Sequence, residues 1–372
     1  GIPMVCALGA DILHLHHGQQ AILDGNQGKV LTSLTAQESF RYREIQHALL
    51  EQQAVAVQHA KRPAITRDGR MVSVCANANS PQEVAQSRDV GADGIGLLRT
   101  EYLFRGRATP PTFAEQEQTY ARFITQVTGQ LTVRALDAGG DKPVNYIAHQ
   151  REENPFLGLR GVRLLIDEPE ILRTQYRALQ AATYRTVGDV EVRFMLPMIS
   201  TFEEIDAVHD VLDALPKDLP PLKIGIMIEV PSAALIARSL APLVDFFSIG
   251  TNDLAQYVLA TDRTNSTVAR MADPLHPSVL HLIHITCNAA REVGKPVSLC
   301  GEIAGDTTAV PLLLGLGIDE LSVPLPAVPL VKEAVRQCDT NQCQQLALQA
   351  VRCRTALSVR GLLVDGASDY AA

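Results

Sequence analysis

The sequence predicts an α/β protein built on a (β/α)8 TIM barrel, preceded by a linker helix and the tail of a β-rich domain. Eight short apolar, β-branched runs alternate with longer helical patterns over about 300 residues, the pattern of a closed parallel barrel. Runs that are apolar on both faces are typical of buried parallel strands. The eight expected strands are residues 71–77, 94–98, 131–136, 191–198, 223–230, 246–250, 296–303 and 320–324.

The competing fold is an open doubly wound sheet. It is the weaker prediction, because no Gly-x-Gly-x-x-Gly motif follows the first strand. Two helix starts after expected strands support the alternation. Ser80 and Glu83 form one predicted capping box with Pro81 at the first helical position, and Ser200 and Glu203 form another.

The chain before the barrel divides into two expected parts. Residues 1–34 contain the turn signals Asp24-Gly25 and Gln27-Gly28 between apolar runs, which predicts the end of a small β-rich domain. The opening Gly-Ile-Pro-Met suggests a cut inside a longer polypeptide. Residues 35–65 begin with a capping box from Thr35 to Glu38 and predict a linker helix, and residues 66–372 form the barrel.

Composition excludes several classes of protein. The 372 residues are 46% hydrophobic and 20% charged, with a net charge of −8 and no basic block, which argues against a nucleic-acid surface. The longest apolar stretch, residues 309–318, is much shorter than the about 20 residues that a membrane span needs. Seven cysteines without a CxxC pair indicate reduced thiols in the cytoplasm, and Cys338 with Cys343 lacks the second pair of a zinc site.

Polar residues gather where the expected strands end, which is where barrel proteins place their functional groups. A structural account of eight buried strands does not require charged groups there. These strand ends and the segments after them carry Arg99, Arg134, Lys142, Arg160, Glu229, Asn252, Asp253, Arg263 and Cys300. Four arginines on one rim imply a small, multiply anionic ligand, because guanidinium groups bind phosphate and carboxylate bidentately.

Two strand-end carboxylates suggest a metal ion. Glu229 and Asp253 are hard oxygen donors, and two carboxylates with ligand oxygens and water make a typical Mg²⁺ site. Capping of a following helix is the alternative role for Glu229. Cys300 lies between Leu299 and Gly301 at a strand mouth and is an acid–base candidate, with simple burial as its alternative. His14, His16 and His17 are interpreted as solvated loop histidines.

Six motifs in order resemble the phosphoenolpyruvate (PEP)-utilising barrel, as found in enzyme I of the bacterial sugar phosphotransferase system and in enzyme I-like modules of multiphosphoryl transfer proteins. The resemblance covers roughly residues 66–330, and residues 1–34 resemble the tail of the swivelling phosphohistidine domain. The motifs are Leu98-Arg-Thr-Glu-Tyr102, Arg134-Ala-Leu-Asp-Ala-Gly-Gly-Asp-Lys142, Glu153-Asn-Pro-Phe-Leu-Gly-Leu-Arg160, Gly225-Ile-Met-Ile-Glu-Val-Pro231, Phe246-Phe-Ser-Ile-Gly-Thr-Asn-Asp-Leu254 and Cys300-Gly-Glu-Ile-Ala-Gly-Asp306.

The resemblance implies roles for the arginines and the amide. Arg99 and Arg134 would hold the phosphate of PEP, and Arg160 would add positive charge near its bridging region. Arg263 together with Asn252 would hold the carboxylate.

For the remaining residues, the resemblance implies metal binding and chemistry. Glu229 and Asp253 would bind Mg²⁺, and Lys142 would assist at the phosphoryl group. Cys300 would protonate the enolate carbon as pyruvate forms.

The implied activity is that of a PEP-protein phosphotransferase serving bacterial sugar uptake. Its barrel donates the phosphoryl group to a histidine on a swivelling domain, from which a histidine phosphocarrier protein receives it. The Gly-Gly-x-x-Ser-His-type acceptor loop is missing here, so this chain is expected to bind PEP and Mg²⁺ without completing transfer alone. A cytoplasmic homodimer is also implied. A second departure from the pattern is the proline-rich eighth strand, Leu321-Ser-Val-Pro-Leu-Pro326.

Three other functions stay open. The barrel could belong to a pyruvate phosphate dikinase or PEP synthase, which would need an ATP-grasp domain elsewhere. It could be an aldolase or lyase that uses the same metal–enolate chemistry. The third alternative is a non-catalytic module that senses PEP and dimerises.

Overall fold

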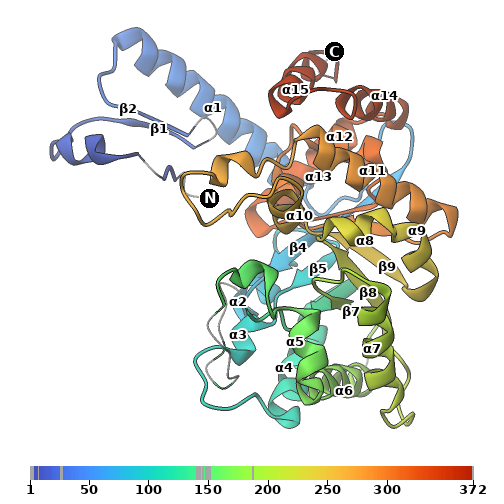
Figure 1. Cartoon of the computed structure of the whole chain (residues 1–372). Helices are drawn as coiled ribbons and strands as arrows, with labels where there is room; N and C mark the ends of the chain where they lie inside the picture. Colours follow the sequence, from blue (N-terminus) through green and yellow to red (C-terminus); the bar gives the residue numbers. More distant parts are fainter. Residues whose placement is uncertain are drawn as a thin grey trace.

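The computed structural model describes residues 4–6, 8–25, 28–139, 144, 146, 152–186 and 188–370, and the side chains of Asp11 and residues 365–370 lie outside this description. A short antiparallel pair, β1 (Ile22–Asp24) and β2 (Lys29–Leu31), precedes the long helix α1 (Ala36–His59). Together they stand apart from the main body (Figure 1). The predicted turn residue Gln27 lies outside the described residues, whereas the predicted hairpin strands are present.

Helix α1 begins as the sequence predicts. The Thr35 side chain accepts from the Glu38 N–H, and the Glu38 carboxylate accepts from the Thr35 N–H at 2.9 Å, which completes the capping box. The other end of α1 packs against α13 (Val328–Gln337), where Ala56 is buried and His59 Nδ1 lies 3.6 Å from Glu333 Oε2.

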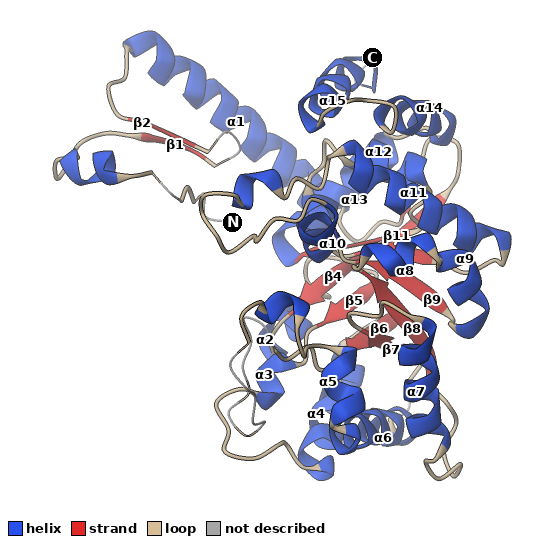
Figure 2. Cartoon of the chain, in the orientation of Figure 1, coloured by secondary structure: helices blue, strands red, loops and turns tan. Residues whose placement is uncertain are grey.

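The main body is a closed barrel of eight parallel strands (Figure 2). Each strand pairs with the next along the chain, and the last pairs in parallel with the first, from Glu320 opposite Ser73 to Pro324 opposite Asn77. A two-residue strand β3 (Ala64–Ile65) adds an antiparallel extension to the first. The barrel strands are β4 (Met71–Ala78), β5 (Gly94–Leu98), β6 (Gln130–Arg134), β7 (Glu191–Leu196), β8 (Lys223–Ile228), β9 (Phe246–Ile249), β10 (Val297–Leu299) and β11 (Glu320–Pro324).

All eight predicted strands are therefore confirmed, and the open sheet is excluded by the β11–β4 pairing. Several strands end before the apolar run does, since the chain leaves the sheet at the rim. The predicted run 296–303 contains a strand of only three residues, because Glu302 already starts the 3₁₀ helix η5 (Glu302–Gly305). The proline-rich eighth run divides similarly between β11 and the 3₁₀ helix η6 (Leu325–Ala327).

Helices surround the barrel. The α-helices not yet introduced are α2 (Pro81–Gln86), α3 (Glu101–Phe104), α4 (Phe113–Gln126), α5 (Val162–Asp167), α6 (Pro169–Arg185), α7 (Phe202–Asp213), α8 (Pro231–Leu235), α9 (Ala237–Leu240), α10 (Thr251–Val258), α11 (Pro277–Glu292), α12 (Val310–Leu316), α14 (Thr340–Ala350) and α15 (Ala356–Tyr370). Other 3₁₀ turns are η1 (Ala10–His14), η2 (Pro155–Leu157), η3 (Ala241–Leu243) and η4 (Ala269–Met271).

The predicted capping box of α2 is confirmed in part. Ser80 accepts from the Glu83 N–H at 3.3 Å with Pro81 at the first helical position, but the Glu83 carboxylate accepts from the Asn79 N–H at 2.6 Å instead of completing the box at Ser80. The prediction of a Ser200–Glu203 box is wrong by one residue. Helix α7 is capped at Thr201, and the Glu204 carboxylate accepts from the Thr201 N–H at 3.1 Å, because the chain turns into the helix one residue later.

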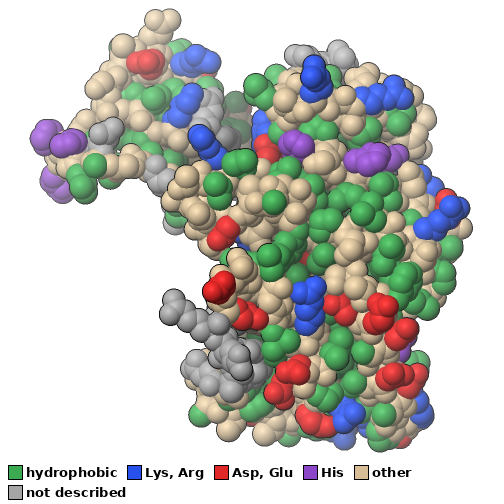
Figure 3. Space-filling model, viewed as in Figure 1, with side chains coloured by type: hydrophobic (Ala, Val, Ile, Leu, Met, Phe, Trp, Pro, Cys, Tyr) green, Lys and Arg blue, Asp and Glu red, His purple; other side chains and the backbone are tan. Residues whose placement is uncertain are grey.

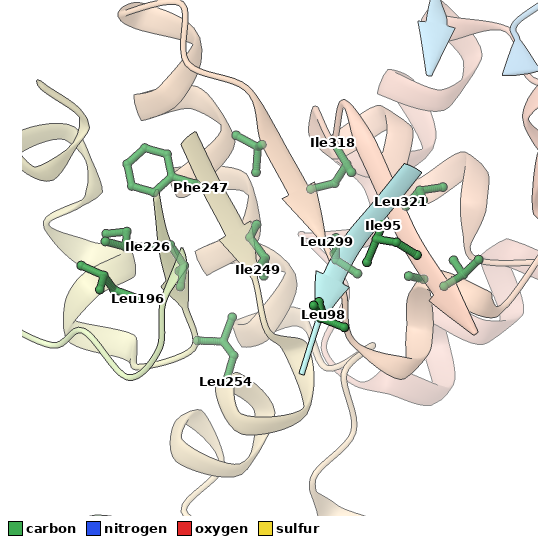
Figure 4. Close-up of a cluster of buried hydrophobic side chains, with 14 of the residues drawn as sticks. Ile95, Leu98, Leu196, Ile226, Phe247, Ile249, Leu254, Leu299, Ile318 and Leu321 are labelled. Atoms are coloured by element: carbon green, nitrogen blue, oxygen red, sulfur yellow. The ribbon is translucent and has the colours of Figure 1, made fainter. Parts of the chain in front are cut away.

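The core lies between the barrel and the helices. Outward-facing strand side chains pack there, among them Ile95, Ile226, Phe247 and Leu321, all essentially inaccessible (Figure 4). Because side chains alternate along a strand, the barrel interior holds a separate set. That second cluster consists of Leu97, Met195, Met227, Phe246 and Cys300.

The outer surface carries mixed charges. On the face shown in Figure 3, Lys and Arg side chains are scattered among acidic and apolar ones. Among the described residues, no helix combines the length and the apolar character that crossing a membrane requires.

Candidate active site

The mouth formed by the carboxyl ends of the strands contains a chain of buried ion pairs. Arg134, the last residue of β6, contacts the Glu101 carboxylate at the start of α3 and lies 3.4 Å from Asp137 Oδ2. Asp137 is shared, since Arg160 Nη2 lies 3.0 Å from the same oxygen. These four side chains are at most 9% exposed, so their charges interact with little screening by water.

The chain of ion pairs continues across the mouth to α10. Arg160 Nη1 lies 3.3 Å from Asp253 Oδ1, and Arg263 Nη2 lies 3.4 Å from the same oxygen. The Phe156 ring from η2 sits beside both guanidinium groups, 5.8 Å from each to its centroid. Tyr257 accepts from Arg160 at 3.3 Å and donates to the Phe156 carbonyl at 2.5 Å, which ties this loop to α10.

Glu229 is a buried carboxylate affected by charges of both signs. It follows β8, is 1% exposed, and its Oε1 accepts from the Met198 N–H at 2.7 Å. Met198 has φ +62°, an unusual conformation for a non-glycine residue that points this N–H at the carboxylate. Burial, and then the negative charges of Asp253 and Asp137, raise the pKa of Glu229 to about 8.

Cys300 follows β10 at the top of the interior cluster. Its Sγ accepts from Ser248 Oγ at 3.4 Å and lies 3.6 Å from the Ile249 carbonyl oxygen. Burial raises the pKa of the thiol to about 11, while the charges of Arg134 and Arg99 act in the opposite direction. The thiol is therefore protonated at neutral pH, as a proton donor must be, and both arginines are close enough to affect it.

Two further predicted residues, Arg99 and Asn252, lie at the edge of the mouth. Arg99 is exposed and donates to Asn79 Oδ1 at 3.2 Å. Asn252 makes a reciprocal pair with Glu302, donating to its Oε1 at 3.3 Å and accepting from its N–H at 3.1 Å. Lys142, the remaining predicted contact, lies outside the described residues.

A buried amide, Gln175, holds the ends of β5 and β6 in place. Its Oε1 accepts from the Leu136 N–H at 2.9 Å, and its Nε2 donates to Thr100 Oγ1 at 3.1 Å. Thr100 in turn donates to the Arg134 carbonyl at 3.0 Å. This network fixes the backbone from which Arg134 projects.

Sequence reasoning gave no role to several of these groups. Glu101 and Asp137 lie inside two of the six motifs, close in sequence to Arg99 and Arg134. Their positions could therefore have predicted that they pair with arginines of the rim. Phe156, Tyr257 and Gln175 carried no such signal, because their roles depend on contacts between distant segments.

The donor set fits Mg²⁺. Glu229 and Asp253 are hard oxygen donors, and the pKa of Glu229 is raised first by burial and then by the charges of Asp253 and Asp137. A divalent cation held by Glu229 and Asp253 would stabilise the ionised form of Glu229. Among the described residues, no group of three or more His, Cys, Asp or Glu side chains is arranged to hold a metal. Mg²⁺ commonly uses only one or two carboxylates and completes its shell with water and substrate oxygens, so a two-carboxylate site suits it.

Comparison with known proteins assigns the family. Residues 53–340 match the family model described as PEP-utilising enzyme, PEP-binding domain, and the chain belongs to that family. It is 42% identical over 364 residues to a multiphosphoryl transfer protein of Rhodobacter capsulatus, which covers 97% of this chain and 44% of that protein. It is 39% identical over 336 residues to the phosphoenolpyruvate-protein phosphotransferase of Bacillus subtilis, covering 88% and 58%.

The chain therefore spans about half the length of these curated relatives. A third relative, the phosphoenolpyruvate-protein phosphotransferase of Haemophilus influenzae, is 39% identical over 357 residues, covering 94% of this chain and 61% of that protein. Among solved structures, a citrate lyase from Burkholderia xenovorans LB400 matches with a TM-score of 0.43 and 14% identity, covering 82% of this chain and 93% of that one, a likeness too low to bear on function.

Proposed function

We propose that this chain is the PEP- and Mg²⁺-binding barrel of a phosphoenolpyruvate-protein phosphotransferase. In this role it donates the phosphoryl group of PEP to a histidine outside the chain and releases pyruvate. One observation supports the proposal most strongly. Buried arginines, two carboxylates suited to binding Mg²⁺ and a protonated thiol lie at the same mouth of a barrel that belongs to this family.

The arginines supply positioning and charge neutralisation, which dominate phosphoryl transfer. Arg99 and Arg134 bind the phosphate, whereas Arg263 with Asn252 binds the carboxylate and Arg160 adds charge between them. The ion pairs to Glu101, Asp137 and Asp253 hold the buried arginines in fixed positions before substrate arrives. Bound Mg²⁺, held by Glu229 and Asp253, would supply Lewis-acid stabilisation of phosphoryl and enolate oxygens.

Cys300 supplies the proton that completes pyruvate. When the P–O bond of PEP breaks, the phosphoryl group passes to the acceptor histidine nitrogen and an enolate remains. The Cys300 S–H transfers its proton to the enolate carbon, which leaves a thiolate beside Arg99 and Arg134. A proton from water later restores the thiol.

The family and the relatives support a proposal for the partner, the location and the assembly of this chain. We infer that a histidine phosphocarrier protein receives the phosphoryl group after the acceptor domain, in support of sugar uptake, and that Lys142 assists at the phosphoryl group. All seven cysteines are free, in keeping with a cytoplasmic location. A homodimer is expected, and sedimentation velocity tests it.

Calorimetric titration of PEP with and without Mg²⁺ tests the binding step. PEP should bind the parent chain only weakly without Mg²⁺, and Glu229→Gln should lose the Mg²⁺-dependent gain in affinity. Glu203→Gln, an exposed carboxylate on α7, is the matched control and should keep that gain. An affinity for PEP that is the same in Glu229→Gln and in the control contradicts the metal assignment.

Transfer is tested by adding the N-terminal part of a related phosphotransferase in trans and assaying pyruvate. Pyruvate should form without added nucleotide. A strict requirement for ATP or AMP would instead assign the barrel to a dikinase or synthase. Cleavage of a 2-oxo-hydroxy acid would indicate a lyase, and PEP-dependent association without any pyruvate would indicate a sensing module.

A further inference from the structure

A cavity of about 470 Å³ lies at the face of the barrel opposite the candidate active site. It is bounded by segments that lead into β4, β10 and β11, where these strands begin rather than where they end, and by the start of α14. The lining residues are Arg70, Cys287, Arg291, Gly294, Lys295, Pro296, Leu314, Gly317, Asp319, Thr340 and Gln344. Its size is in the range of cavities that bind small molecules.

Three of the lining side chains are cationic, and one is already fully engaged. Arg70 donates to the Leu314 and Ile318 carbonyls at 3.1 and 2.7 Å and to Asp319 Oδ1 at 3.0 Å. Asp319, the single acidic lining residue, is also engaged, since its Oδ2 accepts from the Val297 N–H at 3.0 Å. Arg70 and Asp319 therefore form a neutral, fixed corner of the cavity.

Arg291 and Lys295 are less engaged with carboxylates than Arg70. Arg291 donates from Nη1 to Asn288 Oδ1 at 3.0 Å, and among the described residues it has no ion pair within 4.0 Å. Lys295 Nζ forms a long ion pair, 4.0 Å from Asp245 Oδ1, and Asp245 does not line the cavity. The charged lining residues are therefore three cations and one carboxylate, in a chain whose net charge is −8.

Gly317 makes room for the guanidinium group. A Cβ at this position would lie 2.5 Å from Arg291 Nη2, and the residue has φ +108°, which only glycine adopts without strain. Pro296 adds exposed apolar surface beside the two cations, whereas the lining residues Cys287 and Leu314 are at most 2% exposed. Cys287 is 2% exposed and burial raises its pKa to about 12, so it brings no negative charge to the cavity.

We propose that this cavity is a second ligand site, which binds a small phosphate monoester through Arg291 and Lys295 and contacts its organic part with the apolar wall. Guanidinium and ammonium groups bind phosphate, and the only carboxylate paired with either group among the described residues is Asp245, 4.0 Å from Lys295 Nζ. Asp319 does not compete with the phosphate for Arg291 and Lys295, because its carboxylate is already bonded to Arg70 and to the Val297 N–H. The site is separate from the proposed PEP site, because it lies at the opposite ends of the strands.

Phenyl phosphate is a suitable probe, since it combines the dianion with a small apolar group. Calorimetry should give at least a tenfold lower affinity for the double variant Arg291→Gln/Lys295→Gln, as expected for losing charge-assisted contacts. The matched control is Arg185→Gln/Lys217→Gln, which removes the same two charges from exposed positions that do not line the cavity. Its affinity should stay within about twofold of the parent.

Hydrogen exchange separates this site from the mouth, where the probe can also bind. Protection by phenyl phosphate is expected in residues 291–297 and 314–319 of the parent and the control, and is expected to vanish there in Arg291→Gln/Lys295→Gln. Unchanged thermal midpoints show that the variant is folded, and Arg291→Lys/Lys295→Arg should retain binding. Protection confined to residues 131–137, or equal affinities in the two double variants, overturns the proposal.

Discussion

At the scale of single residues, Glu229 makes stability depend on pH. Its pKa is about 8 in the folded, metal-free chain and about 4.5 when unfolded, so between these values the folded state holds one more proton. This contribution to stability is fully present below pH 4.5 and is lost as pH rises towards 8. The physical cause is burial beside two other carboxylates, which disfavours the ionised form.

Glu229→Gln should remove that dependence. The free energy of unfolding of the variant minus that of the parent should increase with pH, by at most about 1.4 kcal/mol per pH unit. Urea unfolding without metal at pH about 5, 6 and 7 measures it. Glu203→Gln is the control, because its pKa is lowered and it does not titrate in this window. Parallel curves for the parent and Glu229→Gln would show that the mouth does not raise this pKa.

Replacing Cys300 should affect the chemical step but not the binding of PEP. Cys300→Ala should change PEP affinity by less than about twofold, but should lower pyruvate formation in the complemented enzyme by about 10²–10⁴-fold, the usual contribution of a general acid. Because the thiol is protonated up to a pH of about 11, its ionisation should not limit the parent's rate at neutral pH. Normal turnover by Cys300→Ala would remove this thiol from the mechanism.

At the scale of elements, the corner between β10 and α10 depends on Gly301. A Cβ on Gly301 would lie 1.7 Å from Thr251 Oγ1, at the first residue of the helix that carries Asp253. Gly301→Ala should therefore cost about 1–3 kcal/mol of stability through overpacking, and should also weaken Mg²⁺-dependent PEP binding by moving α10.

The control for this corner is Gly188→Ala, since no atom of the described residues lies within 4 Å of a Cβ there. Urea unfolding and PEP titration of both variants measure the two effects. Equal stabilities for Gly301→Ala and Gly188→Ala would show that the structure accommodates the added Cβ at position 301 without cost. PEP binding by Gly301→Ala would then be expected to stay unchanged, which contradicts the prediction.

The starts of α1 and α7 show which helix boundaries could be predicted from neighbouring residues alone. The capping box of α1 was predictable because Thr35 and Glu38 are three residues apart and need no tertiary partner. The start of α7 was missed by one residue because Ser200 and Thr201 are both good caps. In the structure Thr201 is the N-cap, and Glu204 completes the box.

At the scale of the whole molecule, an ion pair joins the helix after the last barrel strand to the segment between the first two barrel strands. Lys332 of α13 lies 2.6 Å from Asp93 Oδ1, and Asp93 Oδ2 accepts from the Val74 N–H in β4 at 2.9 Å. The lysine side chain is 1% exposed, whereas the aspartate side chain is 36% exposed. The pair supports closure of the barrel where β11 meets β4.

Replacing Asp93 and replacing Lys332 should lower the free energy of unfolding by different amounts. Asp93→Asn leaves a buried ammonium without its counter-ion and should destabilise the chain by about 3–5 kcal/mol. Lys332→Met leaves a carboxylate that reaches water and still accepts from Val74, so its cost should be less than half of that. Denaturant unfolding of both variants decides, and equal costs would contradict the difference in burial.

The sequence by itself determined the barrel and the end at which the candidate site lies. Eight apolar runs with helices between them have one compact closed arrangement, and parallel strands bring their carboxyl ends to one face. The arginines, carboxylates and thiol follow those strands in the sequence. The barrel therefore brings them to the same face.

Only the tertiary structure decided which of these groups pair and what protonation they adopt. Arg160 and Asp253 are 93 positions apart, and no local pattern relates them. Arg134 is buried against Glu101, whereas Arg99 remains exposed beside Asn79. Protonation of Glu229 and Cys300 depends on burial and on neighbouring charges, which are properties of three-dimensional distance and solvent access rather than of residue order.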